Sequence, residues 1–434
     1  MALVRGPFIQ SLSKTNATII WYTDTSNEDS IVLLGTTTNF TNRYQNSTIS
    51  NTVATSKNSS SSSTVRTDSG KYKHSIRISG LEPNTKYYYA VGSTQAGILS
   101  SGSTTNFFYT SPETDNEQDM RFWVVADMGV GTSNQKAVKD RFITFNGSNK
   151  VDAWLWIGDN AYNYGYFSEY DSTIFTGINT YQTELKKFPV FSVLGNHDYG
   201  TSSSGGYLSS TAQQNLKEYF TIFNLPSTSQ CGGVASFSPK YYSLDWGNVH
   251  IIAMDGYNYL NPGSEQYNWL LNDLENNTKK WTILFQHFPA FTHGTHNSDT
   301  SSECVEFREK ITPIIYQNNI DLVLHGHSHV YERTYFMYNF TGLSADWSSS
   351  YITQPTSPYN KTLSAGTIFI VVGNGGQGGP VGTSGTWPHS AMTAYDRSTW
   401  ASLVIDITGT TTQTMTVRAI NSSGTIIDSF QIIK

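Results

Sequence analysis

Five short apolar runs stand out along the chain, and each ends abruptly at a polar residue or a glycine. They are rich in β-branched and aromatic residues, and runs of this length and composition are typical of buried strands. We therefore predict strands at residues 122–126, 153–157, 190–194, 282–286 and 322–324. In an open sheet, ligands bind in the crevice beyond the carboxyl ends of the strands. The residues that follow these runs are thus expected to meet at one rim of a sheet.

Between the runs, the spacing of apolar residues changes to that of helices. Helical spacing after Ser133 and after Ser264 is carried by Val138, Phe142, Phe145, Tyr267, Leu270, Leu271 and Leu274. Strands that alternate with helices indicate a largely parallel sheet with helices outside it. Residues 400–434 return to strand patterns, which we expect to complete a second sheet packed on the first. The expected architecture is an α/β (α+β) fold, a β-sandwich flanked by helices.

Residues 1–115 show strand patterns only, as in the alternation of Ile76 and Ile78. Residues 80–89 resemble the tyrosine corner of fibronectin type III sandwiches, in which a Tyr hydroxyl bonds nearby backbone and fixes the turn. The polar run 59–63 is expected to be a loop insertion. The acidic, apolar-free stretch 111–118 is expected to hold the domain boundary. We predict an all-β, fibronectin type III-like domain at 1–115 and a second domain at 119–434.

Composition narrows the classes of protein to consider. Only 14% of the 434 residues are charged, while Ser, Thr, Asn and Tyr are abundant, which favours a secreted, extracellular or lysosomal-type location. The net charge of −6 disfavours nucleic-acid binding through phosphate contacts, and no apolar run is long enough to span a membrane. Nine Asn-x-Ser/Thr sequons fit a glycoprotein, although this composition produces many by chance. Cys231 and Cys304 permit one disulfide or two free thiols.

Each predicted strand is followed by a side chain of a type that binds metal ions. The carboxylates, carboxamide and imidazoles at these ends are Asp127, Asp159, Asn196, His287, His327 and His329. Imidazoles suit Fe, Zn and Mn, and a carboxylate such as Asp159 can bridge two ions about 3.5–4 Å apart. Tyr162 adds a phenol, a hard donor that favours a trivalent ion. The pattern predicts a site for a pair of metal ions.

These residues occur in motifs that resemble the metallophosphoesterase signature in its purple acid phosphatase form. The motifs are Asp-x-Gly at 127–129, Gly-Asp-x-x-Tyr at 158–162, Gly-Asn-His-Asp at 195–198, the single His287 and Gly-His-x-His at 326–329. Common metallophosphoesterases have a His ligand where Gly129 stands here, and Tyr162 is expected to fill that place. The resemblance implies Fe(III) plus a divalent Fe, Zn or Mn ion. It assigns metal one to Asp127, Asp159, Tyr162 and His329, and metal two to Asp159, Asn196, His287 and His327.

The resemblance also implies an acid phosphatase that hydrolyses small phosphate monoesters by direct attack of a metal-bound hydroxide. His197, next to a ligand but not itself expected to bind metal, is the best proton donor to the leaving group. Plant members of the family place adjacent histidines after the single His, where they contact phosphate. Here His296 falls at that spacing, Asn297 replaces the second His, and His293 could substitute. The alternative is that both are solvated loop histidines.

Two neighbours of the last motif are expected to have structural roles. His325, at the end of its strand, is expected in the core or behind the ligands. Glu332 and Arg333 are expected to form an ion pair that braces the loop of His327 and His329.

Two other functions stay open at this point. One is a Mn- or Zn-dependent phosphodiesterase of the same superfamily, and the other is a non-enzymatic surface adhesion protein with a relic metal site. The residues leave open the physiological substrate, the second ion and the oligomeric state.

Overall fold

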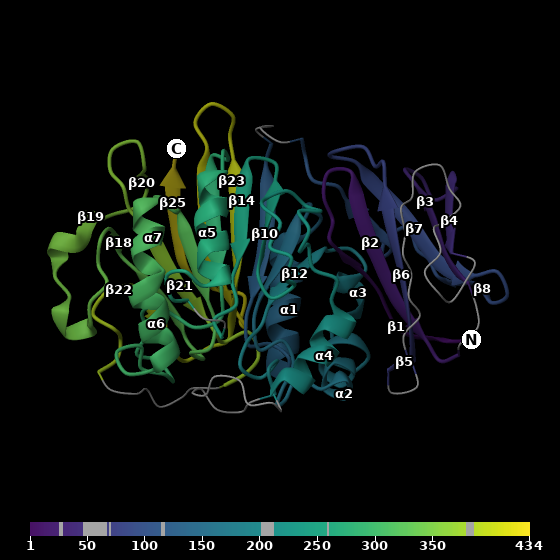
Figure 1. Cartoon of the computed structure of the whole chain (residues 1–434), viewed down its shortest axis with the longest axis horizontal. Coiled ribbons are helices and arrows are strands. Elements are labelled where there is room, and N and C mark those ends of the chain that lie inside the picture. Colours follow the sequence, from purple (N-terminus) through teal and green to yellow (C-terminus); the bar gives the residue numbers. More distant parts are fainter. Residues whose placement is uncertain are drawn as a thin grey trace.

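The chain folds into two parts that lie side by side along its longest axis (Figure 1). This computed structural model describes residues 1–25, 29–46, 67–68, 71–113, 118–200, 212–257, 260–378 and 386–434. The N-terminal part, purple to blue in Figure 1, is built of strands, and the larger part contains mixed sheets and helices. The expected loop at 59–63 lies outside the described residues, as does the centre of the predicted boundary, 114–117. A boundary at residue 115 therefore stays a prediction.

The N-terminal part contains two antiparallel sheets, with strand orders β1–β2–β6–β5 and β4–β3–β7–β8, and β9 also pairs with β7. The strands are β1 (Leu3–Gln10), β2 (Asn16–Thr23), β3 (Ser30–Gly35), β4 (Asn42–Asn46), β5 (Thr67–Asp68), β6 (Lys71–Ser79), β7 (Lys86–Ser93), β8 (Gly97–Ser100) and β9 (Phe107–Tyr109). The Glu82 N–H donates a hydrogen bond of 2.9 Å to the Tyr87 hydroxyl. This contact confirms the predicted tyrosine corner, which fixes the turn into β7.

The second part is a sandwich of two seven-stranded sheets. The first sheet has the order β12 (Val190–Val193), β11 (Ala153–Ile157), β10 (Met120–Val125), β23 (Ala401–Thr408), β24 (Thr414–Asn421), β25 (Ile426–Ile433) and β20 (Tyr359–Asn360). The second has the order β13 (Tyr242–Trp246), β14 (Val249–Ala253), β15 (Trp281–Phe285), β16 (Leu322–His325), β21 (Ile368–Val372), β17 (Tyr331–Thr334) and β22 (Met392–Asp396). One continuous cluster of buried apolar side chains includes residues of both sheets, so the sheets share a core.

All five predicted strands are present, but their grouping differs from the expectation. Strands β10, β11 and β12 pair in parallel in the first sheet, whereas β15 and β16 pair in parallel in the second. The C-terminal strands extend the first sheet, through antiparallel pairing of β23 with β10, rather than forming a second one. The expectation of one rim in one sheet was wrong because an apolar run predicts a buried strand but not its neighbours. The site described below therefore lies at an edge shared by two packed sheets.

Helices cover the outer faces of the sandwich (Figure 1). On the first sheet, α1 (Ser133–Asn146) places the Phe142 ring flat on Trp123, with centroids 4.0 Å apart. On the second sheet lie α5 (Glu265–Glu275), α6 (Ser302–Lys310) and α7 (Thr312–Gln317), whose apolar residues form a separate cluster with that face. Both helices follow the predicted helical spacing, and Ser264 caps α5 while Thr132 caps α1.

Shorter elements fill the remaining space. They are α2 (Phe167–Tyr170), the π-helical turn η1 (Asp171–Phe175), α3 (Gln182–Leu185), α4 (Ala212–Ile222), the 3-10 turns η2 (Ser344–Asp346) and η3 (Ser349–Tyr351), and the pair β18 (Phe336–Met337) and β19 (Ile352–Gln354). Helices α2, α3 and α4 lie next to the N-terminal part (Figure 1). They therefore connect the first sheet of the sandwich to the N-terminal domain.

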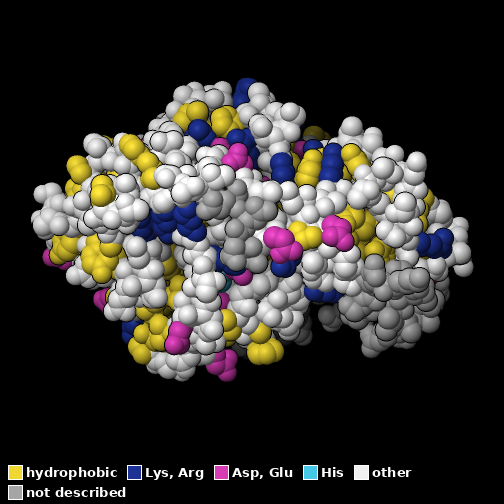
Figure 2. All heavy atoms as spheres, turned by 90° about the horizontal axis from the view of Figure 1, so that it is seen from above, with side chains coloured by type: hydrophobic (Ala, Val, Ile, Leu, Met, Phe, Trp, Pro, Cys, Tyr) yellow, Lys and Arg dark blue, Asp and Glu magenta, His cyan; other side chains and the backbone are white. Residues whose placement is uncertain are grey.

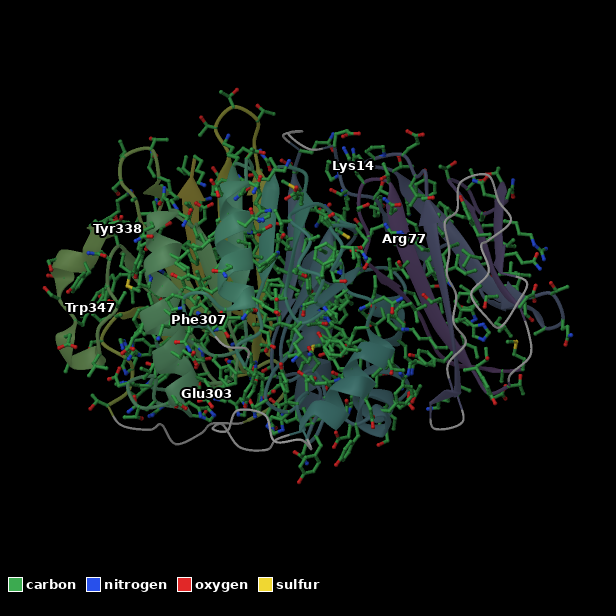
Figure 3. All side chains as sticks on the ribbon, viewed as in Figure 1. Lys14, Arg77, Glu303, Phe307, Tyr338 and Trp347 are labelled. Atoms are coloured by element: carbon green, nitrogen blue, oxygen red, sulfur yellow. The ribbon has the colours of Figure 1, made fainter. Side chains whose placement is uncertain are left out.

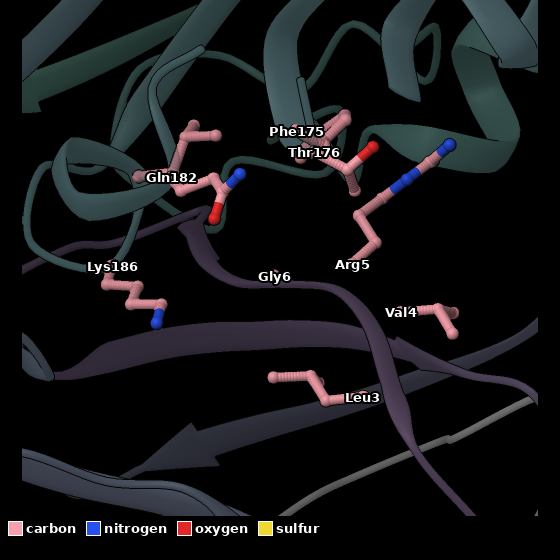
Figure 4. Close-up of a pocket in the computed structure, with 9 residues that line it drawn as sticks. Leu3, Val4, Arg5, Gly6, Phe175, Thr176, Gln182 and Lys186 are labelled. Atoms are coloured by element: carbon pink, nitrogen blue, oxygen red, sulfur yellow. The ribbon is translucent and has the colours of Figure 1, made fainter. Parts of the chain in front are cut away.

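Arg5 is central to the junction between the two parts. Its guanidinium lies 3.6 Å from the centroid of the Phe167 ring and 2.6 Å from the Asp171 carboxylate. A cation held against an aromatic face and a carboxylate is stabilised when water is excluded, and Arg5 is only 2% exposed. A cavity of about 300 Å³ borders Arg5 and Lys186 at this junction (Figure 4). The N-terminal domain is thereby attached to the helix that follows Tyr166.

The surface carries few charged groups, as the composition predicts, but not every sequon is exposed. Uncharged side chains and backbone cover most of the face in Figure 2, and charged groups are scattered over it. No described helix is both long and apolar enough to cross a membrane. Cys231 and Cys304 are both free and buried. Two of the sequon asparagines, Asn146 and Asn421, are buried and so are poorly placed to accept a glycan.

Candidate metal centre

Sharp turns at the ends of β10 and β11 place two carboxylates at the shared edge of the sheets. Asp127 and Asp159 have φ angles of 53° and 50°, in the left-handed region that non-glycine residues rarely adopt. Such backbone strain is concentrated at functional sites. Both side chains are buried, with exposed fractions of 0% and 1%. Isolated buried carboxylates are costly, so the surroundings must supply positive charge or hydrogen bonds.

Close packing at this edge requires glycines. A Cβ at Gly326 would lie 2.5 Å from Asp127 Oδ2, and one at Gly195 would lie 2.2 Å from Asp159 Oδ1. These positions let the His327 and Asn196 loops approach the carboxylates. The His327 N–H accordingly donates to Asp127 Oδ2 at 2.9 Å.

Tyr162 lies between the two carboxylates. Its hydroxyl is 2.9 Å from Asp127 Oδ1 and 3.1 Å from Asp159 Oδ2. The backbone explains why a phenol from residue 162, rather than an imidazole from residue 129, occupies this place. A Cβ at Gly129 would lie 2.0 Å from the Asn160 carbonyl oxygen, so no side chain fits there. The structure thus accounts for the missing His of the Asp-x-Gly motif.

On the other side of Asp159, three donor groups converge. His287 Nδ1 is 2.8 Å from the Ile157 carbonyl oxygen, which only accepts, so Nδ1 carries a proton and Nε2 faces the site. That Nε2 lies 3.2 Å from Asp159 Oδ2 and 3.3 Å from Asn196 Oδ1. His327 Nδ1 lies 3.0 Å from the same Asn196 oxygen. Ligand atoms of Asp159, His287 and His327 all lie within 4.8 Å of one another.

His329 completes the group on the side of Asp127. Its Nε2 is 3.5 Å from Asp127 Oδ1, and its side chain is 19% exposed. The His329 N–H donates to Thr295 Oγ1 at 2.9 Å, which ties the His-x-His loop to the loop of His296. All seven residues that the sequence predicts as ligands therefore lie around Asp127 and Asp159.

The electrostatics of the group call for a cation. Burial alone would raise the pKa of Asp159, but the imidazoles of His287 and His197 lower it. Conversely, burial would lower the pKa of His287, but Asp159 and Asp127 raise it. Burial and the two carboxylates raise the pKa of the Tyr162 hydroxyl well above its usual value. When no cation is bound, protonated imidazoles, His287 first among them, would therefore have to supply the positive charge that these carboxylates face.

Four further observations show that the donor set fits metal ions. When His287 Nε2 is unprotonated, three acceptor atoms face one another: this nitrogen and the side-chain oxygens of Asp159 and Asn196. A bound cation would remove the repulsion between them. Burial lowers the pKa of His327 well below its usual value, so this imidazole is neutral and able to coordinate. Its Nε2 is buried without a hydrogen-bond partner among the described residues. The bond from His287 Nδ1 to a carbonyl is the orientation typical of metal-bound histidines.

His197 lies beside the ligands without joining them. Its Nε2 is 3.8 Å from Asp159 Oδ2, and its Nδ1 is 2.6 Å from the Asn163 carbonyl oxygen. Its ring lies against Tyr162 with centroids 4.3 Å apart. Since the carbonyl of Asn163 requires a proton on Nδ1, the Nε2 edge of His197 is directed to the site.

The two loop histidines are in different places. The His296 ring stacks on His327, with centroids 3.8 Å apart, and is only partly buried. His293 is buried instead between the Thr386 carbonyl oxygen, 2.7 Å from Nδ1, and Asp299, 3.1 Å from Nε2. His296 is thus the loop histidine at the candidate centre.

His293 belongs to a second group of possible ligands, with Asp299 and His389. His389 Nδ1 accepts a hydrogen bond from the Ala391 N–H at 3.1 Å, so a neutral His389 carries its proton on Nε2. That nitrogen faces Asp299 at 3.6 Å. In this tautomer His389 presents an N–H rather than a lone pair to Asp299, so it offers no ligand atom, and at 3.6 Å the contact is longer than a hydrogen bond.

Sequence reasoning gave no role to Asp198, which fastens the loops behind the ligands. Its carboxylate accepts from the Gly195 N–H at 2.8 Å, the Asn160 side chain at 2.9 Å and the Tyr170 hydroxyl at 2.5 Å. Burial and the charge of Asp159 raise the pKa of Asp198 to about 7. Its place at the end of the Gly-Asn-His-Asp motif was the only signal in the sequence.

The expected ion pair between Glu332 and Arg333 does not form. Adjacent residues of β17 point to opposite faces, because side chains alternate along a strand. Glu332 accepts hydrogen bonds from the Thr292 hydroxyl and, at 3.3 Å, from the His293 N–H. Arg333 instead pairs with Asp428, with Nη2 3.1 Å from Oδ1. His325 is in the core as expected, fully buried with its ring against Phe307.

Comparisons with known proteins agree with this geometry. Residues 120–331 match the family model described as calcineurin-like phosphoesterase, and residues 8–110 match the purple acid phosphatase N-terminal domain. Purple acid phosphatase 15 of Arabidopsis thaliana is 27% identical over 326 residues, which cover 70% of this chain and 53% of the relative. A purple acid phosphatase of Glycine max is 24% identical over 349 residues, which cover 79% of this chain and 68% of the relative. The chain thus spans about half the length of the Arabidopsis relative it matches.

A solved structure shares the whole fold. The purple acid phosphatase isolated from yellow lupin (Lupinus luteus) seeds superposes with a TM-score of 0.72 at 20% identity, covering 98% of this chain and 73% of that one.

An edge of two packed sheets, with carboxylates, imidazoles and a carboxamide around one point, defines a calcineurin-like phosphoesterase domain. With the matching N-terminal domain before it, this chain belongs to the purple acid phosphatase family, as its sequence motifs predict. The family implies a binuclear metal centre.

Proposed function

We propose that this protein is an acid phosphatase that hydrolyses small phosphate monoesters at the Asp127–Asp159 centre. The observation that carries the proposal is the convergence of buried side chains that can ligate metal on Asp159 Oδ2: the Tyr162 oxygen at 3.1 Å and His287 Nε2 at 3.2 Å. A carboxylate flanked in this way can serve two ions at once. The relic-site alternative is disfavoured because none of the seven predicted ligand residues is missing from the group.

We also propose that the ions are Fe(III), held by Asp127, Asp159, Tyr162 and His329, and a divalent ion, held by Asp159, Asn196, His287 and His327. The phenol supports Fe(III) on the first side, because a phenolate is a hard anionic donor. When bound, such ions lower the pKa of water and neutralise the charge of the phosphoryl group.

The remaining polar side chains at the centre would handle the ester. His197, with its Nε2 edge directed to the site and Nδ1 fixed by Asn163, is placed to protonate the leaving oxygen. His296, stacked on His327, is placed to contact the phosphoryl oxygens.

The test is phosphate release from p-nitrophenyl phosphate, measured from acidic to neutral pH, with bis(p-nitrophenyl) phosphate as the diester. We expect the monoester to be hydrolysed in the acidic range, the diester much more slowly, and both reactions to stop after chelation. Preference for the diester would favour the phosphodiesterase alternative. A protein that binds no metal and hydrolyses neither ester would contradict the proposal.

The identity of the first ion has its own test in Tyr162→Phe. A charge-transfer band in the visible spectrum of the purified protein should disappear in this variant, because the phenolate that produces it is gone. Tyr181→Phe is the matched control, since Tyr181 is also buried and its hydroxyl has no hydrogen-bond partner among the described residues. A band that survives Tyr162→Phe would exclude Tyr162 as the iron ligand.

We further propose secretion, on the support of the weakly charged composition and the exposed sequon residues Asn39 and Asn339. Expression in a secreting eukaryotic host followed by peptide mapping should find glycans at exposed sequons and none at the buried Asn146 and Asn421. Retention of unglycosylated protein in the cytosol would contradict this location.

A further inference from the structure

Two tyrosines on the loop after Tyr162 are exposed in a way that the proposed chemistry does not explain. Tyr164 is 40% and Tyr166 is 42% exposed, and their ring centroids lie 5.4 Å apart. Aromatic side chains offer large, stiff contact surfaces, and their exposure on a loop beside a functional site suggests binding.

Contacts on both sides place this loop at the rim next to His197. The carbonyl of Asn163 bonds His197 Nδ1 at 2.6 Å. Gly165 packs on the backbone of the Gly-Asn-His-Asp loop, because a Cβ there would lie 2.8 Å from Asp198 Cα and 2.9 Å from the His197 carbonyl oxygen. Tyr164 and Tyr166 therefore flank a residue that touches the histidine loop.

The loop is also held firmly. The Glu169 carboxylate accepts hydrogen bonds of 2.9 Å from the N–H groups of both Tyr164 and Tyr166. The next residue, Phe167, is fixed under the guanidinium of Arg5 from the N-terminal domain. A surface that is already ordered loses little conformational entropy when it binds.

We propose that Tyr164 and Tyr166 form an aromatic platform for the leaving group, so that monoesters bearing an aromatic ring are the preferred substrates. This inference rests on the proposed function. If His197 protonates the leaving oxygen, the rest of the leaving group extends past that imidazole, and the segment 163–166 contacts the imidazole through the Asn163 carbonyl. A planar aryl or nucleobase ring stacks on tyrosine, whereas a sugar or glycerol group gains less from it.

The test compares esters with the same scissile bond. Adenosine 5′-monophosphate and ribose 5-phosphate share one alkoxide leaving group and differ only in the base, and 1-naphthyl and phenyl phosphate provide an aryl pair. We expect the wild-type protein to favour the larger ring system by about 5- to 10-fold in kcat/KM, mainly through KM, because stacking is present before the reaction as well as during it. A preference seen only with the nucleotide pair would identify nucleosides as the leaving groups, and one seen only with the naphthyl pair would identify simple aryl groups.

Variants of Tyr164 and Tyr166 then test whether these side chains cause the preference for the larger ring system. Tyr164→Ala and Tyr166→Ala should lower kcat/KM for the ester with the larger ring system to the level of its partner and so abolish the preference. The corresponding Phe variants should retain it, because stacking needs the ring and not the hydroxyl. Tyr338→Ala is the matched control: Tyr338 is 37% exposed and lies far from the loop, near α7 and β18 (Figure 3).

Two outcomes would overturn the platform. One is equal kcat/KM within both ester pairs in the wild-type protein, and the other is a preference that survives in both alanine variants. A protein that hydrolyses none of the four esters would refute the proposed function itself, which separates the two failures.

Discussion

Asp159→Asn is the substitution most informative about the paired ions. Asparagine keeps the shape of the side chain and one oxygen but removes the negative charge. In the structure this carboxylate faces the Tyr162 hydroxyl on one side and His287 on the other, and the His197 N–H fixes its Oδ1 at 2.8 Å. Because one group faces both halves of the site, its loss should weaken both ions together.

The size of the effect follows from charge and burial. Two unit charges 4 Å apart interact by about 4 kcal/mol at an effective dielectric constant of about 20. A loss of that size lowers an affinity by roughly a thousandfold. Asp159 is 1% exposed, so solvent does not screen this interaction as it would at the surface. We expect both ions to bind about a thousandfold more weakly.

Metal content after dialysis against a graded chelator series measures this directly. Asp127→Asn is the companion variant and should weaken only the ion on its own side. Asp140→Asn, which removes an exposed partner of Lys136 on α1, is the control and should change neither ion. Full retention of both ions in Asp159→Asn, or loss of one ion with the other unaffected, would refute the bridging role.

Three further outcomes are expected. His197→Ala should slow esters with poor leaving groups more than activated aryl esters, and equal losses in steady-state assays would exclude His197 as the acid. Cys231 and Cys304 should be unreactive to a thiol reagent in the native protein and should yield two thiols after denaturation, whereas a disulfide would yield none. Burial lowers the pKa of His250, but bonds to two aspartates raise it from 6.5 to about 9, so its charge stabilises the fold below pH 6.5 and that contribution is lost as pH rises towards 9. The free energy of unfolding, obtained from thermal denaturation, should fall by about 3 kcal/mol as the pH rises from 6.5 to about 9. In His250→Gln the free energy of unfolding should change less with pH.

Much of the site could be predicted because strand ends and ligand chemistry are local properties. Apolar runs predict buried strands, and the Asp, Asn and His residues after them are recognisable by type and order. Tyr162 was identifiable through the family resemblance, since Gly129 stands where related proteins have a His ligand and Tyr162 lies in the next motif along the chain. The tyrosine corner at Tyr87 likewise depends on a few neighbouring residues.

What the sequence did not predict depends on pairing between distant segments. The apolar runs do not predict that β23 pairs with β10, and they do not predict that the ligands come from two sheets. The partner of Arg333 is Asp428, on a strand far along the chain, and strand alternation excludes the adjacent Glu332. Asp198 could not be assigned a role because its partners, such as Tyr170, become neighbours only in the fold.

Anomalous X-ray diffraction from crystals of the protein as isolated tests the central claim most directly. We expect two peaks about 3.5–4 Å apart on either side of Asp159, with an iron edge at the peak next to Tyr162. A single peak, or two peaks away from Asp159, would contradict the account.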